Sequence, residues 1–174
     1  NVLLDRIVKS EGITSPSEIL EKMHKGVVHS LRQKQNKNAD GMDMSVVVID
    51  NERKILTFGG AMNPLVYFQN KNMHLIKGTR RCIGGVDQYR EQPFEEHLVD
   101  ITTETTFYIF SDGYQDQFGD NGKKYMSKRF KELLELIHIE PLDKQQTQLE
   151  QEHLTWRNSK VDQTDDILVI GCRI

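Results

Sequence analysis

The chain has 174 residues, 37% hydrophobic and 28% charged, which is enough to bury one core of ordinary size. Its 23 basic and 26 acidic residues give a formal net charge of −3, which argues against a general nucleic-acid-binding surface. No apolar run approaches the ~18 residues that a membrane span needs. The two cysteines, Cys82 and Cys172, are too few for a disulfide framework and are expected to be reduced. We therefore predict a single cytoplasmic domain, residues 1–174, and leave open whether membrane or sensor segments lie upstream in the protein.

Two helices are predicted in the first part of the chain. Apolar residues between Val2 and Val8 have helical spacing. The segment Ser15-Pro16-Ser17-Glu18 is a capping box with proline at the first helical position. Apolar residues then repeat on one helical face at Leu20, Met23, Val27 and Leu31.

Strands follow in close succession. Runs rich in β-branched and aromatic residues predict strands at Met44–Ile49, Lys54–Phe58, Leu65–Gln69, Met73–Lys77, Leu98–Ile101 and Thr105–Phe110. Turn residues join them in pairs, which predicts three hairpins. The first four strands are expected to form an antiparallel meander.

The segment 78–92 has no periodicity and contains several glycines, so it is predicted to be a loop. Lys77, Arg80 and Arg81 cluster there; an ordinary solvated connection is the preferred interpretation, and the alternative is a basic rim that binds a phosphorylated partner. Helices at Ser127–Ile139 and Asp143–Arg157 come next, before a last strand that includes Ile167–Ile170. This order of elements predicts an α+β domain with antiparallel sheets.

Two acidic segments lie directly beside apolar strands. Ser111-Asp112-Gly113 follows the strand that ends at Phe110, and Asp165-Asp166 precedes the last strand. If these strands are antiparallel neighbours, Asp112 converges with Asp165 or Asp166 at one edge of the sheet. Converging carboxylates repel each other, and Mg²⁺ or Mn²⁺ relieves that repulsion because these ions prefer oxygen ligands. The alternative for each segment alone is structural: a helix N-cap at Ser111 or Asp112, and a solvated turn at Asp165-Asp166.

Several separated motifs also occur in one order. They are Asp40-Gly-Met-Asp-Met-Ser45, Phe58-Gly-Gly-Ala-Met-Asn-Pro64, Ile83-Gly84, Tyr108-Ile-Phe-Ser-Asp-Gly-Tyr-Gln-Asp-Gln117, Gly122-Lys-Lys124, Trp156 and Asp165-Asp-Ile-Leu-Val-Ile-Gly171. This order resembles the SpoIIE-type branch of the PPM metal-dependent serine/threonine protein phosphatases. The resemblance implies a layered α/β/β/α sandwich of antiparallel sheets flanked by helices. It also implies hydrolysis of phosphoserine or phosphothreonine by a water that bridges two Mn²⁺ or Mg²⁺ ions.

The resemblance assigns roles to individual carboxylates. Asp112 resembles the metal-ligating aspartate of the family's Ser-Asp-Gly motif, and Asp165 resembles its last metal-ligating aspartate. Asp166, the neighbour of Asp165, is the second choice at that position. Asp43 and Asp116 are further carboxylates, for which a strand-end cap and a surface charge are the preferred interpretations.

Other residue types add little to this prediction. The six histidines lack the spacing of metal ligands, and no serine lies in a Gly-x-Ser-x-Gly elbow, so no protein nucleophile is predicted. Arg80 and Arg81 are candidate substrate-binding residues. A receiver-like phosphotransfer domain would need alternating strands and helices, which the run of hairpins disfavours.

Members of the family carry an upstream Asp-x-x-Gly-His-Gly segment that this sequence lacks. We therefore expect the chain to be the C-terminal portion of a catalytic domain, truncated on its N-terminal side and almost inactive alone. Unpaired sheet edges should also make it self-associate or exchange helices. By analogy, the substrate is a phosphorylated regulatory protein such as an anti-sigma-factor antagonist. The alternative from another class is a catalytically degenerate phosphoprotein-binding or dimerisation module.

Overall fold

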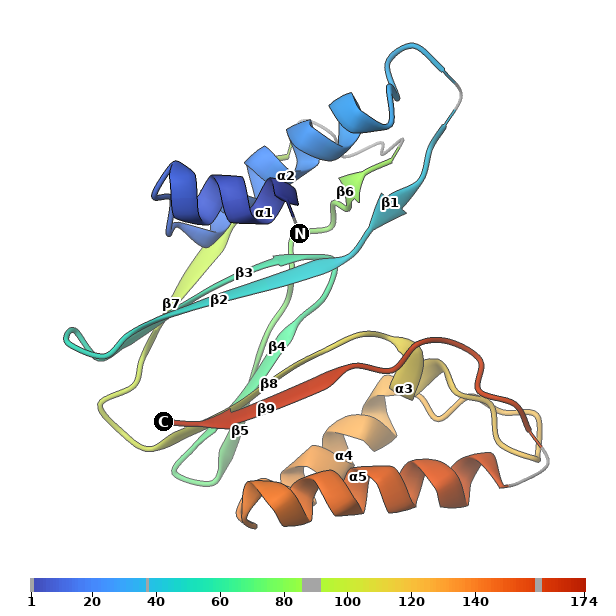
Figure 1. Cartoon of the computed structure of the whole chain (residues 1–174). Coiled ribbons are helices and arrows are strands. Elements are labelled where there is room, and N and C mark those ends of the chain that lie inside the picture. Colours follow the sequence, from blue (N-terminus) through green and yellow to red (C-terminus); the bar gives the residue numbers. More distant parts are fainter. Residues whose placement is uncertain (1, 37, 86–91, 159–160) are drawn as a thin grey trace. The chain divides into compact units, whose positions relative to one another are not determined.

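A computed structural model describes residues 2–36, 38–85, 92–158 and 161–174 (Figure 1). The chain divides into two compact units. Unit 1 consists of Asn1–Leu65 and Leu75–Thr103, and unit 2 of Val66–His74 and Glu104–Ile174. Each unit has its own hydrophobic core.

The helices of unit 1 form where the sequence predicts them. They are α1 (Val2–Asp5), the π-helical η1 (Arg6–Ser10) and α2 (Pro16–Ser30). Ser15 is the N-cap of α2, and its hydroxyl accepts a hydrogen bond from the Glu18 N–H at 3.3 Å. This bond satisfies one of the free N–H groups at the start of the helix. The apolar face of α2 is buried at Ile19, Leu20 and Met23.

Two small sheets complete unit 1. The strands β2 (Met44–Asp50), β3 (Ile55–Ala61) and β7 (Glu96–Asp100) form one sheet in the order β2-β3-β7, and both pairings are antiparallel. The other sheet pairs β1 (Gly41–Met42) with β6 (Ile83–Gly84). The predicted loop 78–92 thus contains a short strand, and its residues 86–91 lie outside the described part. The core combines residues of helices and strands with Phe94, which precedes β7: Ile7, Ile19, Leu20, Met23, Ala61, Ile83 and Phe94.

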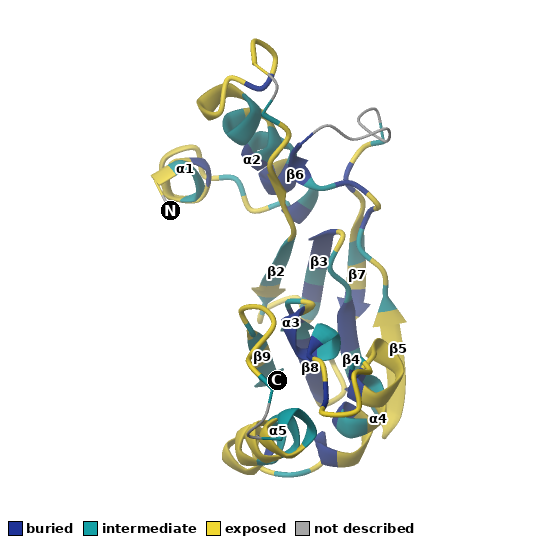
Figure 2. Cartoon of the chain, turned by 90° about the vertical axis from the view of Figure 1, so that its right-hand side faces the viewer, coloured by how far each residue is buried: buried dark blue, intermediate teal, exposed yellow. Residues whose placement is uncertain are grey.

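Unit 2 is built on a four-stranded sheet with the order β5-β4-β8-β9. Its strands are β4 (Leu65–Gln69), β5 (Asn72–Ile76), β8 (Thr105–Phe110) and β9 (Val169–Arg173). Its helices are α3 (Gly113–Asp116), α4 (Ser127–Ile137) and α5 (Leu142–Arg157). Figure 2 shows β8 as a largely buried strand and much of α5 as exposed. The core consists mainly of aromatic side chains, among them Phe68, Tyr108, Phe110, Tyr114 and Phe130.

Two of the predicted strand pairings are wrong. The strands β3 and β4 belong to different sheets, so the first four strands form two separate hairpins and no meander. The strands β7 and β8 are not partners either, although only a short segment joins them. The Ile101 N–H bonds to the Lys54 carbonyl at 2.9 Å, whereas the Thr105 N–H bonds to the Ile174 carbonyl at 2.8 Å. Each strand therefore pairs with a partner distant in sequence, which local turn signals cannot reveal.

The predicted α+β class with antiparallel sheets is confirmed. Cys82 and Cys172 are both free thiols. No helix among the described residues has the length and apolar character needed to cross a membrane.

Candidate metal centre

Asp112 lies just beyond the end of β8, at one end of the four-stranded sheet. Five of the six residues of β8 are buried, and the chain emerges at Ser111. Asp112 has φ −76° and ψ −14° and occupies the N-cap position of α3, but its side chain makes no capping hydrogen bond. Because the carboxylate is exposed and does not cap the helix, it is available to bind a ligand.

The strand β9 lies antiparallel to β8, as the sequence predicts. Phe110 pairs with Val169, and the Ser111 N–H donates to the Leu168 carbonyl at 3.0 Å. The Ser111 hydroxyl then accepts a hydrogen bond from the Leu168 N–H at 3.0 Å and donates one to the Asp166 carbonyl at 3.1 Å. One serine side chain thereby joins the end of β8 to the segment that leads into β9.

Gly113 makes a second close contact with the same carbonyl. A Cβ atom at this position would collide with the carbonyl oxygen of Asp166 and lie 3.0 Å from its carbonyl carbon. Only glycine allows the backbone to approach so closely. Asp112 therefore lies between two residues that both contact the backbone of Asp166, which brings Asp112 and Asp166 together at one end of the sheet.

Asp165 is oriented by its own local bonds. Its Oδ1 atom accepts a hydrogen bond from the Asp166 N–H at 2.7 Å, and its carbonyl accepts one from the Gln163 side chain at 2.8 Å. One carboxylate oxygen of Asp165 is thus partly engaged in the turn. The prediction that Asp165-Asp166 is a turn and the prediction that it binds metal are compatible.

The segment before these aspartates is held by Gln117, whose importance the sequence did not indicate. This fully buried amide donates to the carbonyls of Asp162 and Phe118, both at 3.0 Å, and accepts from the Thr164 N–H at 3.1 Å. The Trp156 indole N–H also donates to the Gln117 carbonyl at 3.0 Å. A buried glutamine with this many bonds rigidifies the approach to the acidic turn. Its only sequence signal is its place at the end of the motif that contains Asp112.

The chemistry of these groups suits a hard divalent cation. Exposed carboxylates supply the oxygen ligands that Mg²⁺ and Mn²⁺ prefer, and Mg²⁺ is often held by one or two carboxylates and several waters. Within the described residues, no group of three or more histidine, cysteine or acidic side chains is arranged to hold a metal ion. Asp112, Asp165 and Asp166 therefore do not form a three-carboxylate metal site in this structure, and their role as metal ligands stays a prediction.

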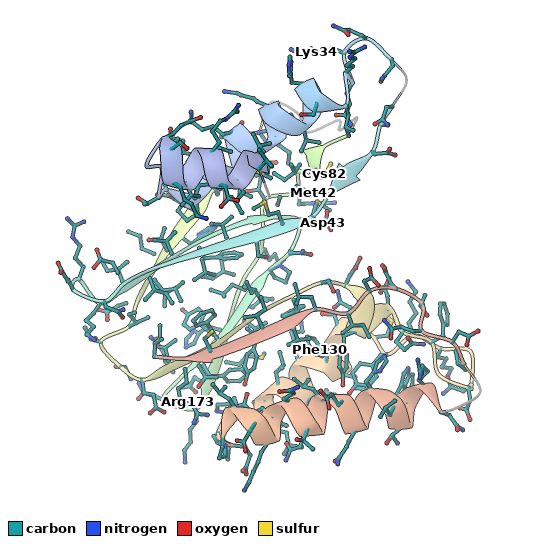
Figure 3. All side chains as sticks on the ribbon, in the orientation of Figure 1. Lys34, Met42, Asp43, Cys82, Phe130 and Arg173 are labelled. Carbon is teal, nitrogen blue, oxygen red and sulfur yellow. The ribbon has the colours of Figure 1, made fainter. Side chains whose placement is uncertain are left out.

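The other candidate residues lie elsewhere. The Arg81 side chain is only 6% exposed in unit 1 and forms an ion pair with Glu21 at 2.5 Å. Arg80 is exposed, and the predicted substrate-binding role of both arginines stays a prediction. Asp116 forms an ion pair with Lys124 at 2.6 Å on the surface of unit 2. Asp43, labelled in Figure 3, is an exposed residue between β1 and β2 of unit 1.

Comparisons with known proteins agree on one class, the PP2C-like phosphatase domains. The SiaA-PP2C domain of Pseudomonas aeruginosa superposes with a TM-score of 0.83 at 26% identity, covering 99% of this chain and 66% of that domain. The phosphatase domain of the cell fate determinant SpoIIE from Bacillus subtilis gives a TM-score of 0.57 at 15% identity, covering 99% and 71%. The structure of the same domain presoaked with Mn gives a TM-score of 0.57 at 17% identity, and the match covers 99% of this chain and 70% of that chain. A search of curated proteins found no match.

The sequence itself matches the family described as Stage II sporulation protein E (SpoIIE) over residues 3–174. The chain therefore belongs to the SpoIIE family, and the predicted resemblance is confirmed. It spans just under two thirds of the length of the SiaA-PP2C domain.

Proposed function

We propose that the protein is a Mn²⁺- or Mg²⁺-dependent phosphatase that hydrolyses phosphoserine or phosphothreonine in a regulatory protein. The observation that carries the proposal is the junction of β8 with the acidic turn, where Ser111 and Gly113 hold the Asp166 backbone beside Asp112. Membership of the SpoIIE family supports the same reaction. In that reaction, water attacks phosphorus, the bond from phosphorus to the serine or threonine oxygen breaks, and inorganic phosphate is released.

The residues of this chain contribute ligands and their positions. Asp112 supplies a carboxylate from the end of β8, and Asp165 and Asp166 supply carboxylates from the turn before β9. Two divalent cations, when bound, activate the water and neutralise charge on the phosphoryl oxygens. Ser111 and Gln117 act as positioning residues, because they fix the backbone on either side of the acidic turn.

The partners follow from the family and stay proposals. We propose a phosphorylated protein substrate of the anti-sigma-factor antagonist type, and a cytoplasmic location for this domain. The acidic balance of the chain gives no reason to expect a nucleic-acid partner.

The test is an assay of the full-length protein on a phosphopeptide with Mn²⁺, together with Asp112→Asn and Asp165→Asn. Each variant should lose at least about 100-fold in kcat/KM, because each removes a charged ligand from a two-metal site. Asp120→Asn is the control, since it removes another exposed carboxylate of unit 2 that lies outside the junction. Full activity in both ligand variants would refute the site. An inactive wild type that still binds the phosphopeptide would favour the degenerate binding module.

A further inference from the structure

Unit 1 contains a basic pocket at the C-terminal end of α2. Its volume is about 350 Å³, within the range of small-molecule sites, which begins at about 300 Å³. Basic and imidazole side chains dominate the lining: His24, Lys25, His29, Arg32, Lys34 and Arg81. No carboxylate is among the described lining residues, although the chain as a whole is acidic. This local excess of positive charge indicates an anionic ligand.

Arg81 is a buried residue in the lining of the pocket. Its Nη1 atom donates to Glu21 at 2.5 Å and to the Gln92 carbonyl at 2.9 Å. The Nε–H group is also buried but has no hydrogen-bond partner among the described residues. The bonds to Glu21 and Gln92 hold the guanidinium in the wall of the pocket. Because Glu21 neutralises Arg81, the net charge comes from Lys25, Arg32 and Lys34.

The turn that carries two of these cations is held in place before any ligand binds. Gln33 is buried, and its amide donates to the Asp40 carbonyl at 2.6 Å and accepts from the Gly85 N–H at 3.1 Å. Arg32 and Lys34 flank this anchor, and Figure 3 labels Lys34 in the turn that follows α2. A turn that is already ordered loses little conformational entropy on binding.

Arg32 occupies a backbone conformation that favours glycine. Its φ is +50°, just after the C-cap residue Leu31, where helices commonly end with glycine or asparagine. A long side chain in the left-handed region is uncommon. Such conformations often occur at functional sites.

Stabilisation of the helix alone does not account for the cluster. Basic side chains in the last turn of a helix interact favourably with its dipole, and His29 lies in that turn. This interaction falls off within that turn, and Lys34 lies beyond the end of α2 at Ser30.

We propose that this pocket binds a small molecule that carries two or more phosphate groups. Arginine and lysine bind phosphate oxygens through charge-assisted hydrogen bonds, and several cations around one cavity favour a multiply charged ligand. No phenylalanine, tyrosine or tryptophan is among the described lining residues, so recognition depends on the phosphates rather than on a stacked ring. The site belongs to unit 1 and needs no divalent cation, so it is independent of the carboxylates of unit 2.

The test is calorimetric titration of inorganic pyrophosphate into the full 174-residue chain in the presence of EDTA. The variant Arg32→Gln/Lys34→Gln should bind at least about tenfold more weakly, because it removes two charge-assisted contacts. The control is Lys9→Gln/Arg53→Gln, which removes the same charge from exposed positions of unit 1 outside the pocket. This control and Asp112→Asn should both bind like the wild type. Bound pyrophosphate should also raise the Tm of the wild type.

If circular dichroism shows that the double variant does not fold, Lys25→Gln replaces it. This variant should also bind pyrophosphate more weakly than the wild type. The proposal is overturned if the wild type shows no saturable binding, or if the control loses as much affinity as the pocket variant. It is also overturned if only a phosphopeptide or an anionic lipid vesicle binds while pyrophosphate does not. Loss of pyrophosphate binding in Asp112→Asn would assign the anion to the acidic junction instead.

Discussion

The substitution Gly113→Ala tests whether the two acidic segments meet as described. Alanine in the first turn of a helix would by itself stabilise the fold by about 0.5–1 kcal/mol, since glycine loses more entropy on folding. Here the new methyl group would collide with the Asp166 carbonyl oxygen and lie 3.3 Å from Ile167 Cγ1. The Ser111 hydroxyl holds that carbonyl, so it cannot move aside freely. Overpacking costs about 1–3 kcal/mol, which outweighs the entropic gain. We therefore expect Gly113→Ala to lower the free energy of unfolding by about 1–2 kcal/mol.

Urea unfolding measures the stability of the variant, and Mn²⁺ paramagnetic resonance measures its metal affinity. Gly113→Ala should unfold at lower urea and bind Mn²⁺ more weakly, because it separates Asp112 from Asp166. Gly122→Ala is a matched control: its φ is +71° and no atom lies within 4 Å of an added Cβ. Gly122→Ala should lose about 1–2 kcal/mol of stability through backbone strain alone, a loss similar to that of Gly113→Ala, and it should keep the Mn²⁺ affinity of the wild type. A Gly113→Ala variant that is as stable as the wild type and binds Mn²⁺ equally well would refute the junction.

Three further predictions concern stability, activity and assembly. Hydrogen bonds, chiefly the one that the Ser15 hydroxyl donates at 2.7 Å, hold the pKa of the Glu96 carboxyl below its usual 4.5. The ionised Glu96 therefore stabilises the fold above about pH 4.5, and this contribution is lost as the pH falls through the lowered pKa. Glu96→Gln should flatten the acid side of the pH–stability curve from urea unfolding, and an unchanged curve would contradict this. The chain alone should bind Mn²⁺ weakly and hydrolyse little p-nitrophenyl phosphate, because two or three carboxylates leave most of the ion hydrated; ready Mn²⁺-dependent hydrolysis would argue against it. The chain should also self-associate in sedimentation experiments, since the edge strand β9 and the residue before it expose Ile170 (41%) and Leu168 (57%), and Ile170→Lys should reduce this association.

Local sequence signals predict the elements well and their pairing poorly. The capping box at Ser15 and the apolar repeat from Leu20 specify α2, because helix formation depends on neighbouring residues. Strand pairing depends on contacts between distant residues, such as Thr105 with Ile174. Short turns at 62–64 and 102–104 resemble hairpin loops in composition, yet each connects strands of different sheets. The antiparallel pairing of β8 with β9 could nevertheless be proposed, since this arrangement brings the two acidic segments to one edge of a sheet.

The candidate site shows the same limit at the level of single residues. The sequence identifies the carboxylates because acidic residues beside buried strands are conspicuous. It does not identify the Ser111 hydroxyl or the Gln117 amide, because a hydrogen bond to a backbone group leaves no pattern in the sequence. Arg81 shows the reverse case: the preferred interpretation of its basic cluster is an ordinary solvated connection, but the Arg81 guanidinium is buried against Glu21.

The Ser-Asp-Gly segment combines three different requirements in three consecutive residues. The Ser111 hydroxyl both donates and accepts a hydrogen bond with the backbone of the facing segment. Gly113 has no Cβ atom, which allows the Asp166 carbonyl to approach. Asp112, between them, makes no hydrogen bond or ion pair through its carboxylate within the described part of the chain, and it does not cap α3. A carboxylate held on both sides by rigid backbone contacts, yet left without a protein partner, is suited to an external cation rather than to a role in stability. The same geometry explains why replacing Asp112 with asparagine should leave the fold intact and remove function, whereas changing either neighbour should disturb both.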